Sequence, residues 1–204
     1  MGTRSRMQSA RHESLRERIT EEAARILADE GGRDYHLAKR KAAARLNESE
    51  TRDLPSNEEI EAALGRRLAL FHGDTRTRLL SGLRQAALDL MSLLERFEPR
   101  VAGALVSGNV TQASPVEIHV AADTPEELRF FLDDAGIPLN DMQRNLRFGG
   151  DRRVLVPGFR FMAGDLKVEV LVFSHAAMRE APLSPVDGHP MQRLNYTEVE
   201  RLLA

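Results

Sequence analysis

The apolar residues of this chain change their spacing near its midpoint, and that change limits the folds that the chain can adopt. Before Pro99, apolar residues recur at the spacing of a helix with one buried face. After Pro99 they alternate with polar residues, as in PVEIHVA (115–121), which is typical of β-strands. We therefore expect an α+β protein with its helices first and a mixed sheet second.

The first half of the chain predicts helices separated by clear breaks. Gly31-Gly32 ends the first helix, a second, Ala-rich helix covers about 34–46, and Leu54-Pro55 interrupts the pattern again. The basic residues at 1–12 are expected to form a tail ahead of this region.

A capping box marks the start of the third helix. Ser56 caps it and Glu59 stands three residues later. We expect this helix to end near Phe71, because His72-Gly73-Asp74 breaks the pattern. A fourth, strongly amphipathic helix follows and closes at Pro99.

The second half predicts the order β-β-α-β-β-β. Its helix is capped at Thr124 with Pro125 at the first position, and a short final helix is expected to be capped at Thr197. Pro157-Gly158 predicts a bulge or an edge in its strand. The expected strands are residues 100–108, 115–121, 142–148, 154–163 and 166–173.

These elements predict two parts. Residues 1–75 form a helical N-terminal region with a basic tail, and residues 76–204 form an α/β domain with a C-terminal loop and a short helix. Within that loop, Pro185 and Pro190 define the path of residues 184–190. The loop either crosses the sheet and covers a cleft or holds the final helix in place, and both interpretations stay open.

Composition excludes several classes of chemistry. There is no cysteine among the 204 residues, which excludes disulfides, zinc–thiolate sites, iron–sulfur clusters and thiol catalysis. Tryptophan is absent and aromatic residues make up 5%, so a base-stacking platform is hard to build. No apolar run approaches the roughly 18 residues of a membrane span, and the N-terminus lacks the apolar core of a secretory signal. We expect a cytoplasmic protein of bacterial type.

The charge is uneven along the chain. Residues 1–45 carry 11 basic and seven acidic side chains, whereas residues 46–204 carry 18 basic and 24 acidic ones. The basic excess includes Lys39, Arg40, Lys41 and Arg45. This region resembles the opening of a TetR-type regulator, which would direct these four residues to nucleic-acid phosphates. The alternative is a solvated face of a plain helical bundle.

One stretch, GALVSGNVTQASPVEIHV (103–120), carries the chemistry. It resembles the nucleotidyltransferase superfamily with the DNA polymerase β-like fold, whose members place a Gly-Ser pair after a strand, then a later glycine, then Ser-Asp-hydrophobic-Asp on the next strand. Gly103 and Ala104 match the pair, Gly108 matches the later glycine, and Ser114 to Glu117 match the final motif. The topology that surrounds this stretch also matches the family.

The resemblance implies roles for particular residues. Glu117 and Glu169 would be the catalytic carboxylates, and Mg²⁺ would be the cofactor of an active enzyme. Nucleotidyl transfer uses two metal ions bridged by carboxylates, and positions i and i+2 of a strand face the same side and can hold both. The residues expected to contact the nucleotide are Gly103, Gly108, Asn109 and Ser114.

The motif departs from the family at two polar positions. Pro115 stands where a metal ligand belongs, and Ala104 lacks the hydroxyl that contacts phosphate. Ordinary two-metal catalysis is therefore not expected. Glu117, His119 and Glu169 could form an altered metal site, or they could be polar residues on an open sheet face.

We therefore expect a catalytically degenerate, nucleotidyltransferase-like protein that binds a nucleotide or a protein partner and has a regulatory role. One alternative is an active Mg²⁺-dependent nucleotidyltransferase that uses Glu117 and Glu169. Another is a nucleic-acid-binding regulator that acts through the basic N-terminal helices.

Overall fold

The computed structural model describes residues 2–30, 34–49, 51 and 53–203 of the chain. The chain divides into two compact units. Met1–Arg76 and Pro185–Asp187 form the first, here called the helical unit, and Thr77–Ser184 and Gly188–Ala204 form the second, the sheet unit. No helix of the described residues has the length and apolar character needed to cross a membrane.

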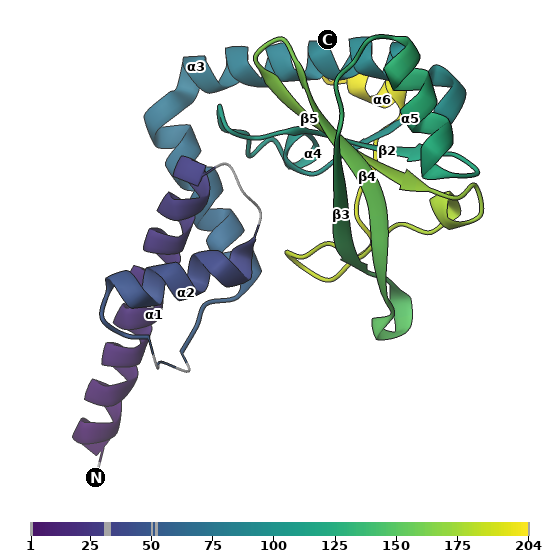
Figure 1. The fold of residues 1–204 in the computed structure, drawn as a ribbon. Helices are drawn as coiled ribbons and strands as arrows, with labels where there is room; N and C mark the ends of the chain where they lie inside the picture. Colours follow the sequence, from purple (N-terminus) through teal and green to yellow (C-terminus); the bar gives the residue numbers. More distant parts are fainter. Residues whose placement is uncertain (1, 31–33, 50, 52, 204) are drawn as a thin grey trace. The chain divides into compact units, whose positions relative to one another are not determined.

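The helical unit contains α1 (Gly2–Glu30), α2 (Tyr35–Arg45) and the first part of α3 (Asn57–Leu93), as Figure 1 shows. α1 begins at Gly2, so the segment expected as a tail has a helical backbone. The proposed break at Gly31-Gly32 lies outside the described residues. The helices enclose a core made largely of small and aliphatic side chains, among them Ile19, Ile26, Ala38, Ala42, Ile60, Ala63 and Leu68.

Local capping explains where two of these helices begin. The Asp34 carboxylate accepts a hydrogen bond from Leu37 N at 2.9 Å and caps α2. The capping box of α3 is confirmed, because Glu59 N donates to Ser56 Oγ at 3.1 Å and Ser56 N donates to Glu59 Oε2 at 2.5 Å.

The predicted break at His72-Gly73-Asp74 is wrong. α3 is a single helix from Asn57 to Leu93, and it contributes residues to both units. A single glycine costs a helix about 1 kcal/mol relative to alanine, and neither histidine nor aspartate stops a helix. Packing on either side of this point outweighs so small a penalty.

The sheet unit is built on one five-stranded sheet in the order β1-β2-β5-β4-β3. β2 and β5 are parallel, and every other neighbouring pair is antiparallel. The fold is therefore α+β with N-terminal helices followed by a mixed sheet, as expected. The strands are β1 (Arg100–Ala102), β2 (Val116–Ala121), β3 (Asn140–Arg147), β4 (Arg153–Ala163) and β5 (Leu166–Phe173).

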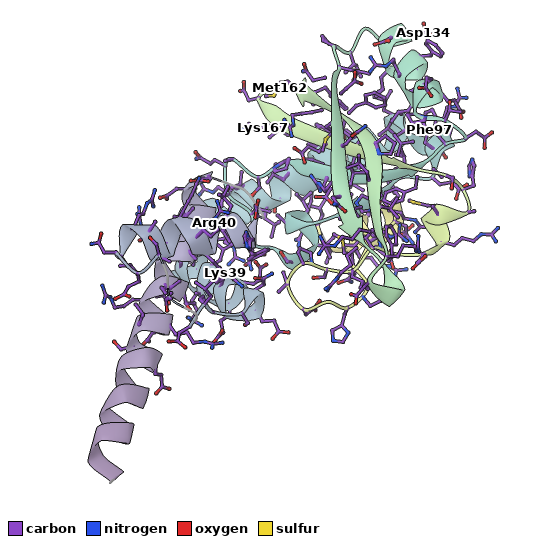
Figure 2. All side chains as sticks on the ribbon, turned by 60° about the horizontal axis from the view of Figure 1, so that its bottom comes forward. Lys39, Arg40, Phe97, Asp134, Met162 and Lys167 are labelled. Carbon is purple, nitrogen blue, oxygen red and sulfur yellow. The ribbon has the colours of Figure 1, made fainter. Side chains whose placement is uncertain are left out.

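Helices and turns connect these strands. α5 (Pro125–Asp134) links β2 to the β3–β4 hairpin, and its Thr124 cap is confirmed. Met162 and Lys167, which face each other near the β4–β5 turn, lie close together in Figure 2. The remaining short helices are α4 (Ala104–Ser107), α6 (Tyr196–Arg201) and three 3₁₀ turns, Glu95–Phe97, Gly149–Asp151 and Ala177–Arg179.

The two faces of the sheet bury different side chains. One face carries the main core with α3 and α5, and the predicted inward residues Val116, Ile118, Val120, Val168, Val170 and Val172 all lie in it. The opposite face carries a smaller apolar cluster of Leu146, Phe148, Val156, Leu171 and Phe173. Met178, from the 3₁₀ turn after β5, packs on that smaller cluster.

Two strand expectations need correction. The strand expected over 100–108 ends at Ala102, because Gly103 turns the backbone to φ 72° and starts the short helix α4. Pro157-Gly158 marks neither an edge nor a bulge, since β4 lies between β5 and β3 and its register with both strands is unbroken. The ladder with β5 begins at Gly158, so the missing N–H of Pro157 removes no bond to β5.

The C-terminal segment is tied to β1. Leu194 exchanges two backbone hydrogen bonds with Val101, and Leu183 N donates to Arg147 O at the end of β3. The final helix is capped by Asn195, whose side chain accepts from Glu198 N, and not by Thr197 as predicted. Asparagine at the N-cap with glutamate at N3 forms a complete capping box two residues before the expected cap.

Candidate functional site

The register of the parallel strands brings the two candidate carboxylates together. Glu117 on β2 stands directly opposite Glu169 on β5. Both side chains leave the sheet on the face opposite the main core, as alternation along each strand requires. His119, two residues after Glu117, points to the same side.

This face is not open around the carboxylates. Glu117 is 6% exposed, Glu169 is 8% exposed and His119 is fully buried. The interpretation as polar residues on an open sheet face is therefore wrong for these three side chains. Burying ionised carboxylates is costly unless each is paired and hydrogen-bonded.

Two arginines from β4, which pairs with β5, and from β3, at the edge of the sheet, supply the pairing. Arg144 on β3 donates from Nη1 to Glu117 Oε2 at 2.6 Å and from Nη2 to Glu169 Oε2, so that one guanidinium bridges both carboxylates. Arg160 on β4 donates from Nε and Nη2 to Glu169 Oε1 at 3.0 and 2.8 Å. Charge-assisted hydrogen bonds between arginine and carboxylate are among the stronger polar interactions in proteins.

The charge state of Glu117 follows from these contacts. Burial raises its pKa, but the hydrogen bond from His119 and the charge of Arg144 outweigh burial and lower the pKa to about 2. Burial lowers the pKa of Arg144, and Glu117 and Glu169 raise it further than burial lowers it. Glu117 is therefore an anion and Arg144 a cation at neutral pH.

His119 is held between this polar group and the apolar cluster. Its Nε2 lies 3.1 Å from Glu117 Oε1, and because an ionised carboxylate only accepts, Nε2 carries the proton in this contact. Its Nδ1 is buried and has no hydrogen-bond partner among the described residues. The ring packs against Phe173, with centroids 4.9 Å apart.

Gly103 has a steric role beside Glu117. A Cβ at Gly103 would lie 3.1 Å from Glu117 Oε2, and the backbone has φ 72° and ψ −138°, where side chains are strained. Glycine at position 103 therefore lets the backbone pass close to the Glu117 carboxylate.

The other candidate nucleotide contacts belong to the segment between β1 and β2. Gly108 ends α4 in the left-handed conformation, with φ 76°. The hydroxyl of Ser114 accepts from Thr111 N at 2.9 Å and lies in a turn. Asn109 N donates to Ser107 Oγ at 3.4 Å.

The arrangement does not fit the Mg²⁺ that the resemblance implies. Mg²⁺ requires carboxylate oxygens that are free to coordinate it. All four carboxylate oxygens of Glu117 and Glu169 instead face nitrogen atoms of His119, Arg144 or Arg160. Across the described part of the chain, no group of three or more histidine, aspartate and glutamate side chains is arranged to hold a metal ion.

A hollow of about 420 Å³ lies elsewhere in the sheet unit. Its lining comes from the end of α3, the start of β1 and the region of α6, and includes Glu95, Arg100 and Tyr196. Neither Glu117 nor Glu169 lines it. The carboxylate pair is therefore packed inside the unit and does not form the wall of this hollow.

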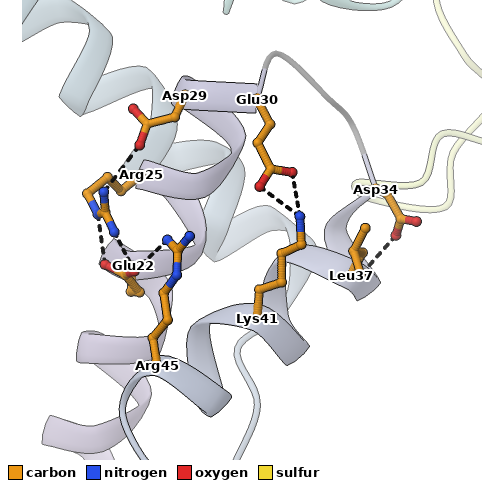
Figure 3. A network of polar contacts seen from close by, with 8 residues as sticks. All are labelled: Glu22, Arg25, Asp29, Glu30, Asp34, Leu37, Lys41 and Arg45. Atoms are coloured by element: carbon orange, nitrogen blue, oxygen red, sulfur yellow. Dashed lines mark hydrogen bonds and ion pairs between the residues drawn. The ribbon is translucent and has the colours of Figure 1, made fainter.

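The four candidate nucleic-acid residues lie on α2 in different surroundings. Lys41 Nζ contacts Glu30 Oε1 at 2.7 Å, and Arg45 Nη1 contacts Glu22 Oε1 at 3.0 Å (Figure 3). Burial lowers the pKa of the half-buried Lys39. Arg40 is exposed, and both residues are labelled on α2 in Figure 2.

Figure 3 shows a second partner of Glu22, Arg25, which contacts it at 2.7 Å and also reaches Asp29. Two of the four candidate residues, Lys41 and Arg45, thus pair with carboxylates of α1. Their charges join two helices of the bundle.

The sequence did not predict Arg144 and Arg160 as residues of the site. The partners of Arg144 lie 27 and 25 residues away and that of Arg160 lies nine residues away, across strand pairings that no local motif reveals. One signal was present: on β3, Arg144 shares its face with Met142 and Leu146, and a charge between two apolar positions needs a buried partner.

Comparison with known proteins did not identify a relative of this chain. The chain matches no protein-family model, and neither a curated protein nor a solved structure resembles it closely enough to count as a match. Function must therefore be argued from the site itself.

Proposed function

We propose that the sheet unit is a catalytically degenerate relative of the nucleotidyltransferases. It binds an anionic ligand, most simply a nucleotide, without a metal ion. The observation that carries this proposal is the pairing of both candidate catalytic carboxylates with arginines. A carboxylate neutralised in this way cannot act as a metal ligand without first losing its partner.

The topology supports the family relationship. A strand, a glycine with positive φ and a short helix precede β2, which carries Glu117, and α5 and a hairpin lead to β5, which carries Glu169. This is the order that the resemblance implies for the two carboxylate strands. The β3–β4 hairpin, inserted between α5 and β5, supplies both arginines.

The nature of the ligand is argued from two further arginines. Arg100 on β1 stands opposite His119, on the same face as Glu117. Its guanidinium forms no hydrogen bond or ion pair within the described residues. Arg193 donates to Met178 O at 2.9 Å and has no carboxylate partner there either. Burial, and then the nearby charge of Arg100, lowers the pKa of Arg193.

Two neighbouring cations without an acidic partner favour an anion. Arginine binds phosphate through two parallel hydrogen bonds, and a phosphate near Arg100 and Arg193 would relieve their mutual repulsion. Because Glu117 and Glu169 already have their countercharges, such a ligand needs no Mg²⁺ to enter.

Calorimetric titration of the full chain with ATP, CTP, GTP and UTP, with Mg²⁺ and with EDTA, tests the proposal. We expect equal affinity in both conditions. Replacing Arg100 and Arg193 by alanine removes charge-assisted hydrogen bonds and should weaken binding by roughly 10- to 100-fold. Arg153→Ala is the matched control, since Arg153 is exposed and stands on the same sheet face as Phe159 and Phe161, opposite Glu117.

Two results would contradict the proposal. Tight binding that requires Mg²⁺ and is lost in Glu117→Gln, together with nucleotidyl transfer, would favour the active enzyme. If the protein bound none of the four nucleotides, nucleotide binding would be contradicted. Binding of a protein partner would then be the better hypothesis.

A further inference from the structure

Arg144 makes contacts that a metal ion would make in an active site of this kind. Its two terminal nitrogens reach one oxygen of each carboxylate, Glu117 Oε2 at 2.6 Å and Glu169 Oε2. Glu117 and Glu169 are register partners on adjacent strands, so the guanidinium lies between two facing anions. A divalent cation that binds two facing carboxylates also lies between them.

The charges of the site balance without any ion. Glu117 and Glu169 carry two negative charges, and Arg144 and Arg160 carry two positive ones. The arginines are not equivalent, because Arg144 contacts both carboxylates, whereas Arg160 contacts only Glu169 and is 54% exposed. Arg144 is therefore the group whose loss leaves two buried carboxylates facing each other.

We propose that Arg144 replaces a divalent cation as the fixed countercharge of the Glu117–Glu169 pair, and that this carboxylate pair becomes a divalent-cation site when Arg144 is removed. The inference rests on the proposed function, because it explains how the degenerate site came to do without metal. It concerns the carboxylates alone and does not depend on which ligand the protein binds.

The residues left after removal are donors that suit a divalent cation. Glu117 and Glu169 would each offer the Oε2 atom that Arg144 releases, and water would complete the shell, as Mg²⁺ and Mn²⁺ prefer. A second change, Arg160→Ala, frees Glu169 Oε1 as well and removes the remaining positive charge. Cation affinity should therefore rise in two steps.

The test measures Mn²⁺ binding to the full chain by electron paramagnetic resonance of free Mn²⁺, with no nucleotide present. We expect the apparent Mn²⁺ affinity to be at least about tenfold higher in Arg144→Ala than in the wild type, and higher still in Arg144→Ala/Arg160→Ala. Mg²⁺ should compete. Adding Glu117→Gln to Arg144→Ala should abolish the gain.

Two controls separate this effect from the simple loss of an arginine. Arg152 lies in the turn of the same hairpin and forms an exposed pair with Glu180, so Arg152→Ala should create no site. Arg144→Lys keeps a positive charge between the carboxylates and should not create one either. A gain of equal size in Arg152→Ala, or one that survives Glu117→Gln, would overturn the inference.

Folding of the variant supplies a second measurement. If Arg144→Ala is unstable without metal, its thermal midpoint should rise when Mn²⁺ or Mg²⁺ is added, and the midpoints of the wild type and of Arg152→Ala should not. A folded Arg144→Ala that binds no cation, or one whose midpoint ignores both cations, contradicts the inference. Neither result bears on nucleotide binding by the wild type, so the two proposals can fail separately.

Discussion

The helical unit and the sheet unit both pair basic residues with carboxylates, but they do so in opposite surroundings. On the helices, Lys41 and Glu30 are 38% and 45% exposed, and the pair of Arg16 and Glu59 is similar. In the sheet, Glu117 is almost completely buried, and its partner Arg144 is 30% exposed. Ion pairs between basic side chains and carboxylates thus lie at the surface of the helical unit and in the interior of the sheet unit.

The difference teaches what each set of pairs contributes. An exposed pair contributes about 0–1 kcal/mol, because water and salt screen it and both side chains lose freedom. A buried pair adds little net stability over an apolar substitute, yet losing one partner costs about 3–5 kcal/mol because a bare charge remains. Pairs on the helices are therefore replaceable, and the pairs in the sheet are not.

The largest effect is expected from Arg144→Ala. Glu117 and Glu169 would both lose a partner in the interior, and we expect a loss of about 3–5 kcal/mol in the free energy of unfolding of the sheet unit without divalent cations. Amide hydrogen exchange of β2 and β5 measures it region by region. Arg152→Ala, which breaks an exposed pair, should leave that exchange almost unchanged. Equal effects of the two variants would remove the contrast between surface and interior.

Acid should act on the sheet unit next most strongly. The pKa of Glu117 is lowered from 4.5 to about 2 in the folded protein, so its contribution is present above pH 4.5 and is lost as the pH falls toward 2. The shift corresponds to roughly 3 kcal/mol. Urea unfolding at pH 6, 4 and 3 should show the decline, and Glu117→Gln should flatten it. A decline of unchanged slope in Glu117→Gln would assign it to other groups.

Acid should matter less on the helices. Hydrogen bonds from Arg16 and Ser56 lower the pKa of Glu59 to about 2 as well, but this carboxylate is 43% exposed. Screening by water leaves little of that shift as stability.

Gly103→Ala should have an intermediate effect. The new Cβ would meet Glu117 Oε2 at 3.1 Å in a backbone conformation that alanine avoids, and we expect a loss of about 1–3 kcal/mol. Gly82→Ala is the matched control, because Gly82 lies in α3 with open space around its Cβ position and should gain about 0.5–1 kcal/mol. Chemical denaturation of both variants gives the comparison. Stabilisation by Gly103→Ala would contradict the close packing of Glu117 against the turn.

The smallest effect belongs to the surface pairs of the helical unit. Lys41→Ala should cost less than about 1 kcal/mol, and the cost should vanish in 1 M salt, where charges are screened within about 3 Å. The cost of Arg144→Ala should persist in the same salt. Circular dichroism during urea unfolding in low and high salt measures both. A cost of Lys41→Ala that salt does not change would show that the lysine acts through packing.

Much of the fold followed from local signals in the sequence. Ser56 with Glu59 and Thr124 with Pro125 predicted helix starts because a cap and its target lie within one turn. The alternation in 115–121 and 166–173 predicted which valines enter the core. The continuity of α3 through Gly73 could not be predicted, because the small local penalty is offset by packing that the sequence does not display.

The sequence predicted the acidic residues of the candidate site but not the basic ones. Glu117 and Glu169 were singled out by a motif and by strand alternation, and the parallel pairing of β2 with β5 puts them opposite each other. Their burial and their arginine partners were missed. Arg144 and Arg160 come from a hairpin whose own sequence shows no link to either glutamate.

By itself the sequence determined the division into N-terminal helices and a later mixed sheet, several helix caps and the valines that enter the core. Those properties depend on neighbours within a few residues, where spacing and capping act. Only the tertiary structure decided how the two glutamates are paired. The strand arrangement places Arg144 and Arg160 in contact with Glu117 and Glu169. Charge in a protein interior depends on partners in space, so the same two glutamates could have been metal ligands or, as here, halves of buried ion pairs.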